Sequence, residues 1–321
     1  MKYYAGIDLG GTNIAVGIVN ENYEILGKAS VKTNLPRSAE EIADDMAKTT
    51  IAAAENAGIT LDDIMWVGVG TPGAANGKTG MVIYSNNLGF NDLPLGKMIS
   101  ERLGGKKVYI ENDANAAAYG EVLAGAAKDV NDAIMITLGT GVGGGIIIDG
   151  KIYSGSNCYG AELGHTVIEY EGRQCSCGRK GCFEAYSSAT GLINMTKEEM
   201  EKDKTSVMWE LIKENDGKVS GRTAFDAMRK GDKAGKAVVD KYISYLACGI
   251  TNMINIFQPE VLVIGGGVCN EGETLLAPLR ELVFEHEYCK DDATRTKICR
   301  ATLGNDAGII GAAFLGNSFE K

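Results

Sequence analysis

The sequence contains an approximate internal repeat, and this repeat limits the possible folds more than any other feature. A β-rich run at residues 3–9 leads into the turn Gly10-Gly11-Thr12-Asn13, and a second apolar run follows at 14–19. The same order recurs with apolar runs at 133–138 and 146–148 on either side of a glycine-rich turn at 139–145. A strand, a glycine turn and a second strand predict a β-hairpin. The duplication therefore predicts a chain with two related halves.

Helix and strand patterns alternate along the rest of the chain. We expect a helix at residues 40–57, strands at 65–70 and 108–110, and an alanine-rich helix at 114–127. This order predicts an α/β fold. The 321 residues exceed the roughly 100 to 200 of a typical single domain, so we expect two domains around a cleft. We expect the first domain at residues 1–115, completed by a C-terminal helix at 305–321, and the second domain at 116–304.

The charge and hydropathy of the chain exclude several classes of protein. The formal net charge is −10 at pH 7, whereas nucleic-acid binding needs clustered Lys and Arg side chains to neutralise phosphates. No apolar stretch approaches the ~20 residues of a membrane span. The N-terminal sequence also lacks the basic start and apolar run of a signal peptide. We therefore expect a cytoplasmic protein that binds neither nucleic acid nor a membrane.

The glycine turns are candidate binding sites for a polyphosphate. Glycine permits positive φ angles and close approach, so that successive backbone N–H groups can bind an anion. Asp8, at the end of the first strand, is suited to bind Mg²⁺, usually through water. A third glycine turn follows another apolar run and suits the adenosine end of a nucleotide. The candidate nucleotide-binding residues are Asp8, Gly10, Gly11, Thr12, Asn13, Gly139, Thr140, Gly141, Gly265, Gly266 and Gly267. The alternatives are simple tight hairpins and, for the third turn, a plain strand-to-helix connection.

Asp113 is the candidate catalytic base. It follows the strand at 108–110, next to Asn112 and ahead of the alanine-rich helix, and catalytic groups collect at such carboxyl ends of strands. Phosphoryl transfer needs a carboxylate that orients the attacking hydroxyl and accepts its proton. An Asp in this position would also be a good N-cap for a helix that begins at Ala114. Taken locally, both interpretations fit.

Three of the eight cysteines lie close together in a glycine-rich segment. Cys175 and Cys177 are separated by one residue, Cys182 follows five residues later, and His165 is one of only two histidines. Thiolate and imidazole groups are the ligands of a structural tetrahedral Zn²⁺. The spacing differs from the common two-residue zinc-finger spacing, so surface cysteines in a flexible segment are the alternative.

Six motifs in order along nearly the whole chain carry a family resemblance. They are Asp8-Leu-Gly-Gly-Thr12, Glu111-Asn-Asp113, Leu138-Gly-Thr-Gly-Val-Gly-Gly-Gly145, Glu162-Leu-Gly-His165, Cys175-Ser-Cys-Gly-Arg-Lys-Gly-Cys-Phe-Glu184 and Ile264-Gly-Gly-Gly-Val268. With these motifs the chain resembles the ROK family of bacterial sugar kinases, repressors and related proteins, within the actin-like ATPase superfamily. Inside the family it is most similar to the zinc-containing bacterial glucokinases. Asn13 is a departure, because many members carry a basic residue there.

The resemblance implies a fold, an activity and a set of site residues. It implies an actin-like (ribonuclease H-like) ATPase fold and an ATP-dependent kinase that converts glucose to glucose 6-phosphate, with Asp113 as the base. The implied cofactors are ATP with Mg²⁺ and a structural Zn²⁺ bound by His165, Cys175, Cys177 and Cys182. The implied sugar contacts are Gly70, Asn87, Asn112, Asp113, Glu162, His165 and Glu184. Asn and Gly are also common in turns for backbone reasons, which is the alternative for Gly70, Asn87 and Asn112.

Other substrates and another functional class are alternatives to a glucose kinase. Fold and phosphate loops do not specify the sugar, so N-acetylglucosamine, N-acetylmannosamine, fructose and allose are possible acceptors. A non-enzymatic, sugar-sensing repressor of the family would carry a DNA-binding extension before the first glycine turn, and we expect none because Asp8 lies so near the start. We expect a hexose and ATP as partners and a homodimer or homotetramer, because closed homo-oligomers are the commonest soluble assemblies.

Overall fold

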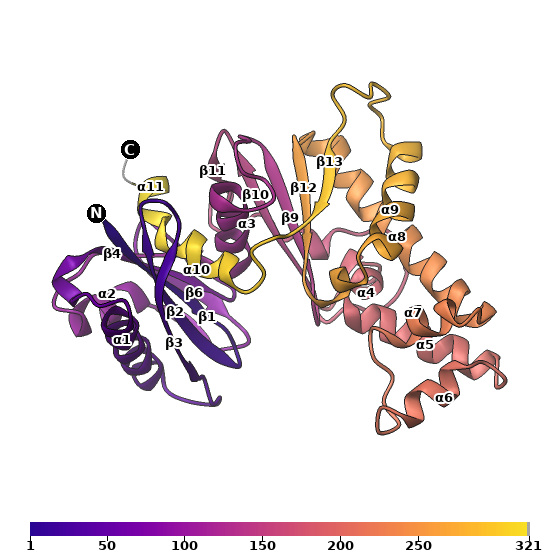
Figure 1. The fold of residues 1–321 in the computed structure, drawn as a ribbon, viewed down its shortest axis with the longest axis horizontal. Helices are drawn as coiled ribbons and strands as arrows, with labels where there is room; N and C mark the ends of the chain where they lie inside the picture. The colour runs from indigo at the N-terminus through magenta and orange to yellow at the C-terminus, as the bar shows by residue number, and fades with distance from the viewer. Residues whose placement is uncertain (320–321) are drawn as a thin grey trace. The chain divides into compact units, whose positions relative to one another are not determined.

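The structure is a computed structural model, and it describes residues 1–319 of the chain. The chain divides into two compact units (Figure 1). The first contains residues 1–135, 145–161 and the chain from Ala301 onward, and the second contains 136–144 and 162–300. The domain limits expected from the sequence are not the limits of these units and stay a prediction. The last two residues of the expected helix at 305–321 lie outside the described part.

A five-stranded mixed sheet forms the centre of the first unit. Its strands are β1 (Tyr3–Leu9), β2 (Asn13–Asn20), β3 (Ile25–Lys32), β4 (Ile64–Thr71) and β8 (Val108–Asn112). The order is β3-β2-β1-β4-β8, in which β1, β4 and β8 are parallel and β2 is antiparallel to β1 and β3. The hairpin predicted at residues 3–19 is therefore confirmed. A small antiparallel sheet of β5 (Ala74–Asn76), β6 (Met81–Ser85) and β7 (Phe90–Leu93) follows β4.

Helices cover both faces of this sheet. The helices of the unit are α1 (Ala39–Asn56), α2 (Leu95–Arg102), α3 (Asp113–Ala124), α10 (Asp306–Ala313) and α11 (Leu315–Phe319), with a short 3-10 turn at Leu61–Asp63. The apolar faces of α1 and α2 join the main core with β1, β2, β4 and β8. On the other face, α10 packs on β1 and β4 and against α3. The expected helices at 40–57 and 114–127 are confirmed as α1 and α3.

Side chains alternate between the two faces of β1, and this alternation determines which face of the sheet carries the Asp8 carboxylate. Ile7 and Leu9 are fully buried in the core shared with α1, so Gly6 and Asp8 lie on the opposite face, because successive strand residues alternate. A Cβ added to Gly6 would lie 1.9 Å from the carbonyl oxygen of Ile309 in α10. A glycine is therefore required where the helix backbone meets the sheet. Asp8 shares the face that α10 and α3 cover.

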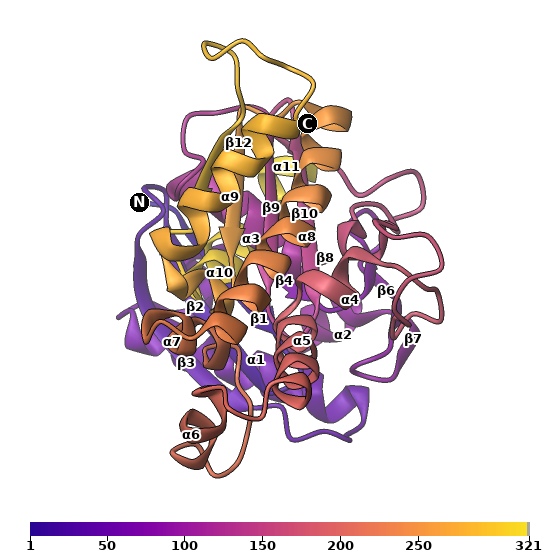
Figure 2. The ribbon, with the colours of Figure 1, turned by 90° about the vertical axis from the view of Figure 1, so that its right-hand side faces the viewer.

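The second unit is rich in helices. They are α4 (Phe183–Ser187), α5 (Ala189–Lys202), α6 (Met208–Lys213), α7 (Thr223–Arg229), α8 (Lys233–Phe257) and α9 (Glu273–His286), with 3-10 turns at Leu163–His165 and Gly267–Glu271. The long helix α8 packs against α4, α5, α7 and α9, and Figure 2 shows α8 beside α9. The aromatic side chains of Phe183, Tyr186, Phe225 and Tyr242 are fully buried here.

A second five-stranded sheet contains the other predicted hairpin. Its strands are β9 (Ala133–Leu138), β10 (Val142–Ile148), β11 (Lys151–Ile152), β12 (Val261–Gly265) and β13 (Lys297–Arg300). The order is β11-β10-β9-β12-β13, so β9 and β10 are neighbours as predicted. Among residues 1–319, no helix has both the length and the apolar character that crossing a membrane requires.

Candidate active site

The carboxyl ends of three parallel strands bring the two predicted acidic residues of the first unit to one edge of the sheet. In the register of the sheet, Asp8 of β1 lies opposite Gly70 of β4, and Gly70 lies opposite Glu111 of β8. The chain then turns directly into α3, whose first residue is Asp113. A Cβ added to Gly70 would approach the Cβ of Ala116 in α3 to 3.2 Å, which is tight, and the Cα of Asp113 to 3.5 Å. The absent side chain at Gly70 thus lets the start of α3 lie against the strand ends.

Asp113 lies close enough to Asp8 to affect the ionisation of its carboxyl group. Burial, together with the negative charge of Asp113, raises the pKa of Asp8 from 3.8 to about 6. Burial also raises the pKa of Asp113, while a hydrogen bond from the Ala114 backbone N–H to Asp113 Oδ1 (2.9 Å) opposes that rise. Two carboxylates that repel each other in a partly buried place are suited to share a cation or to hold a proton.

The N-cap of α3 is Asn112, so the interpretation of Asp113 as the helix cap is wrong. Asn112 Oδ1 accepts hydrogen bonds from the backbone N–H groups of Ala114 (2.9 Å) and Asn115 (3.1 Å), and Asn112 Nδ2 donates to the carbonyl of Gly73 (3.1 Å). The amide of Asn112 therefore joins the helix start to the loop after β4. Because Asn112 has the extended backbone of a cap, Asp113 is the first helical residue and its carboxylate is not needed for capping.

A buried glutamate supports this corner; from the sequence it was named only as the first residue of the motif Glu111-Asn-Asp113, with no role assigned. Glu111 Oε1 accepts from the backbone N–H of Asn112 (2.8 Å) and from Asn115 Nδ2 (3.1 Å). Burial raises the pKa of Glu111. Glu111 is one strand residue before the cap, and so its side chain fixes the geometry from which Asp113 projects.

The two glycine turns are closed in a similar way. The Gly10 N–H donates to the Asn13 carbonyl (2.9 Å), and the Gly139 N–H donates to the Gly141 carbonyl (3.0 Å). In the first turn, Thr33 Oγ1 also donates to the Gly10 carbonyl (2.7 Å). Residues 11–13 and 140 are exposed. Backbone N–H groups at such open turns are available to an anionic ligand.

The start of α5 holds the second turn, which was not predicted. The Ala189 N–H donates to the Gly139 carbonyl (2.8 Å), and Thr190 Oγ1 donates to the Thr140 carbonyl (2.7 Å). Both contacts use carbonyl groups of the turn, so they fix its backbone without occupying its N–H groups. No local pattern around Thr190 indicates this role, because its partner lies 50 positions earlier in the chain.

Glu184 connects the second glycine turn with the cysteine-rich segment. Glu184 Oε2 accepts from the Val142 backbone N–H (2.9 Å), and Glu184 Oε1 accepts from Ser176 Oγ (3.1 Å) between two of the cysteines. A Cβ added to Gly141 would lie 2.3 Å from Glu184 Oε2. The carboxylate is thus packed directly under the turn. Sequence reasoning named Glu184 as a sugar contact and missed these two bonds.

The four predicted metal ligands come together. His165, Cys175, Cys177 and Cys182 place ligand atoms within 4.8 Å of one another. The distance is 3.7 Å from Cys175 Sγ to His165 Nδ1 and 3.6 Å from Cys177 Sγ to Cys182 Sγ. A tetrahedral zinc with Zn–S bonds of about 2.3 Å has sulfur–sulfur edges of about 3.8 Å. The donor set and its size therefore fit Zn²⁺, and the sulfur separation is far too long for a disulfide bond.

Glycines let the cysteine-rich segment fold back on itself. Gly178 and Gly181 have φ angles of +90° and +78°, a region that favours glycine. The Cys175 N–H donates to the Arg179 carbonyl (2.8 Å), which closes a turn over residues 175–179 that contains Cys177. The cluster therefore depends on backbone turns as much as on the spacing of its ligands.

The remaining predicted residues fall in both units. Asn87 is exposed in the loop between β6 and β7 of the first unit, and Glu162 is exposed just before the 3-10 turn at Leu163–His165 of the second. Gly266, with φ +85°, lies against the Leu138 backbone, where a Cβ would approach to 2.5 Å. The third glycine turn connects β12 through the 3-10 turn at Gly267–Glu271 to α9. It is a strand-to-helix connection, as one interpretation held, and its role toward a nucleotide stays a prediction.

Known proteins are similar to the chain over nearly its whole length. The sequence profile of the ROK family matches residues 4–318. A glucokinase of Thermotoga maritima is 36% identical over 309 residues, which cover 96% of this chain and 95% of that protein. A crystal structure of a ROK family glucokinase from Streptomyces griseus, in complex with glucose and AMPPNP, is 34% identical, covers 98% of both chains and has a TM-score of 0.80. A ROK hexokinase from Thermus thermophilus is 31% identical, with 97% and 96% coverage and a TM-score of 0.78.

These similarities settle the fold class. The α/β architecture is that of the actin-like ATPase fold, which the sequence motifs predicted.

Proposed function

The chain belongs to the ROK family, and we propose that it is an ATP-dependent glucokinase, which transfers the γ-phosphate of ATP to the C6 hydroxyl of glucose. The observation that carries the proposal is the placement of Asp113. Its carboxylate lies at the carboxyl edge of β1, β4 and β8, is free of the capping role that Asn112 fills, and interacts with Asp8. The glucokinases among the similar proteins support the choice of glucose.

Asp113 acts as the base in this proposal. The glucose hydroxyl attacks the γ-phosphorus, the bond between that phosphorus and the bridging oxygen to the β-phosphate breaks, and ADP leaves. The proton of the hydroxyl passes to Asp113. Burial raises the pKa of Asp113, and a base with a pKa nearer the working pH is a better proton acceptor.

Asp8 and the glycine turns serve the nucleotide. Asp8 would hold Mg²⁺, directly or through water, and the ion neutralises charge on the phosphates. The turns at Gly10–Asn13 and Gly139–Gly141, and the turn at Gly265–Gly267 for the adenosine end, offer backbone N–H groups. Burial and the negative charge of Asp113 raise the pKa of Asp8, and a cation bound here would offset both effects.

The Cys and His cluster serves as a structural zinc site. Zn²⁺ would be bound by His165 Nδ1 and the three thiolates and would supply stability rather than chemistry. Glu184 then receives a fixed position from Ser176 and holds the second glycine turn at Val142. Zinc would therefore order the nucleotide turn through Glu184 as well as the segment from Glu162 to His165.

The proposed sugar contacts are polar groups of both units. In the first unit, Gly70 lies near the end of β4, Asn87 lies in the loop between β6 and β7, and Asn112 next to the base is a neutral donor and acceptor. Glu162, His165 and Glu184 are the candidates of the second unit. Because Asn112 and Glu184 already bind backbone groups, each would contact sugar only with its remaining hydrogen-bonding capacity.

A homodimer or homotetramer in the cytoplasm is part of the proposal, and light scattering measures the oligomeric state.

A coupled assay of ADP release across a panel of hexoses tests the function. Glucose should give the highest kcat/KM, with one glucose 6-phosphate formed for each ADP. The Asp113→Asn variant, purified in the same way, controls for contaminating kinases. An enzyme that ignores glucose but phosphorylates N-acetylglucosamine or N-acetylmannosamine would contradict the choice of substrate and leave the kinase assignment standing.

A further inference from the structure

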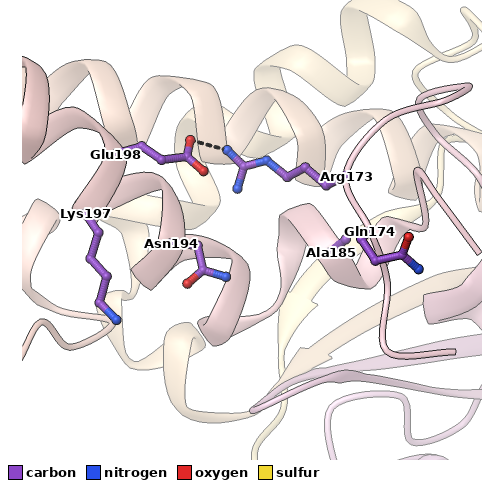
Figure 3. Close-up of a pocket in the computed structure, with 6 residues that line it drawn as sticks. All are labelled: Arg173, Gln174, Ala185, Asn194, Lys197 and Glu198. Atoms are coloured by element: carbon purple, nitrogen blue, oxygen red, sulfur yellow. Dashed lines mark hydrogen bonds and ion pairs between the residues drawn. The ribbon is translucent and has the colours of Figure 1, made fainter. Parts of the chain in front are cut away.

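A polar pocket in the second unit lies beside, and apart from, the residues assigned above. Its volume is about 370 Å³, within the roughly 300 to 1,000 Å³ of small-molecule sites. It is lined by Arg173, Gln174, Ala185, Asn194, Lys197 and Glu198 (Figure 3). Every lining side chain except that of Ala185 is polar or charged. The pocket therefore suits a hydrophilic ligand rather than an apolar one.

The pocket has an excess of positive charge on an acidic protein. Arg173 and Lys197 contribute two cations against the single carboxylate of Glu198, whereas the chain as a whole has a net charge of −10. Figure 3 shows the Arg173–Glu198 ion pair and no such bond for Lys197. A local surplus of cations concentrates anions from solution.

Arg173 is held in place for a ligand. Its backbone N–H donates to the hydroxyl of the buried Tyr186 (2.6 Å), and its guanidinium lies 5.4 Å from the centre of the Tyr186 ring. The guanidinium reaches Glu198 at 2.5 Å, but the Glu198 side chain is 53% exposed. Exposed ion pairs are weak, so an anion can displace this carboxylate while Tyr186 keeps the guanidinium in position.

We propose that this pocket binds a small phosphate monoester that also carries hydroxyl groups. The phosphate binds the Arg173 guanidinium, because a guanidinium contacts phosphate oxygens through two parallel N–H groups, and the ammonium of Lys197, which lies beyond Asn194 in Figure 3, adds a point charge to the same pocket. Glu198 and Asn194 then face the hydroxyl groups, since carboxylate and amide oxygens accept their hydrogen bonds. Glucose 6-phosphate, the product of the proposed reaction, belongs to this class, and its use as a probe rests on the proposed function.

The pocket adjoins the groups that hold the second glycine turn. Gln174 precedes Cys175, and its Nε2 donates to the carbonyl groups of Cys175 (3.1 Å) and Arg179 (3.2 Å). Ala185 follows Glu184, and Asn194, Lys197 and Glu198 belong to α5, whose first residues bind the Gly139 and Thr140 carbonyls. A ligand here thus contacts both segments that fix the turn. Its occupancy should change the KM for ATP.

Calorimetry on the whole chain tests the binding. With glucose and AMPPNP saturating the active site, glucose 6-phosphate should still bind at one site per chain. Lys197→Ala should weaken this binding about tenfold, whereas Lys236→Ala, which removes an exposed lysine of α8 that pairs with Asp240 outside the lining, should leave it unchanged. Glycerol 3-phosphate should give the same pattern, and it does not depend on the hexose kinase assignment. Absence of binding, or equal losses in the two lysine variants, would overturn the proposal.

Variants of opposite charge give a second test. Glu198→Gln should tighten phosphate ester binding a few-fold, because it removes the competing carboxylate, and Glu199→Gln should not. Inorganic phosphate that binds as tightly as the esters would overturn the role of the hydroxyl groups. For the effector role, glycerol 3-phosphate should shift the KM for ATP in the wild type and not in Lys197→Ala. An unchanged KM for ATP in the wild type, or an equal shift in Lys197→Ala, would contradict the effector role.

Discussion

Replacing Glu184 by alanine should weaken nucleotide binding even though Glu184 was first considered for its contact with sugar. The carboxylate accepts the Val142 backbone N–H at 2.9 Å and fills the space beside Gly141. Without it, the Val142 N–H loses its acceptor and the second glycine turn loses the support beneath it. The start of α5 would still hold the turn from its carbonyl side.

The size of the effect follows from the type of bond. A hydrogen bond to a charged acceptor contributes about 1.5 to 3 kcal/mol, which corresponds to about a 10- to 150-fold change in affinity. Glu184 is only partly buried, so we expect the lower half of that range. Glu184→Gln keeps a neutral oxygen acceptor, which still contributes about 0.5 to 1.5 kcal/mol, so it should lose only the difference of about 1 to 1.5 kcal/mol, or roughly 5- to 13-fold in affinity.

The assay is titration of AMPPNP with Mg²⁺ in the absence of sugar, so that a sugar contact of Glu184 cannot contribute. Zinc content by elemental analysis should be the same in the wild type and both variants, since Glu184 is not one of the four clustered ligands. Glucose affinity, measured separately, shows whether the carboxylate also binds sugar. An alanine variant with full zinc that binds AMPPNP within twofold of wild type would refute the coupling, whatever its affinity for glucose.

Three further changes have expected outcomes. Asp113→Asn should lower kcat by roughly 10²- to 10⁴-fold with an unchanged Kd for glucose, and near-normal turnover would remove Asp113 as the base. The pKa of Asp8 is about 6 in the folded protein against 3.8, so in metal-free protein its stabilising contribution is lost as pH rises through 6. Asp8→Asn should then raise the free energy of unfolding by about 1 to 3 kcal/mol at pH 7.5 and by nothing below about pH 4, and urea denaturation at the two pH values measures this. A chelator that removes Zn²⁺ should lower Tm by roughly 5 to 10 °C and weaken AMPPNP binding, and added Zn²⁺ should restore both; a metal-free enzyme with unchanged Tm and activity would exclude a structural metal.

Local patterns predicted the features that depend on local sequence. The two hairpins, α1, α3 and the grouping of His165 with three cysteines each follow from periodicity, glycine placement or donor chemistry. The cap of α3 shows the limit of such reasoning. Asn112 and Asp113 are adjacent and both are good caps, so a boundary shift of one residue exchanges their roles, and only the backbone geometry decides between them.

Long-range contacts could not be predicted from the sequence. Nothing near Thr190 indicates the Thr140 carbonyl, and nothing near Glu184 indicates the Val142 N–H, because residues 42 to 50 positions apart are joined only by the packing of the second unit. Gly6 gave no sign of the close approach of Ile309 for the same reason. Such contacts are formed by tertiary structure, which periodicity does not encode.

The position of α10 has a consequence for folding during synthesis on the ribosome. This helix covers the glycine-bearing face of β1 and β4 and packs on α3, yet it is synthesised after the whole second unit. At roughly 5 to 20 residues per second, that face waits on the order of 10 to 50 seconds before α10 is synthesised. The sheet that is synthesised first therefore receives its second covering helix last. Chains that stop before Asp306 would leave the Gly6 and Asp8 face of β1 without its covering helix.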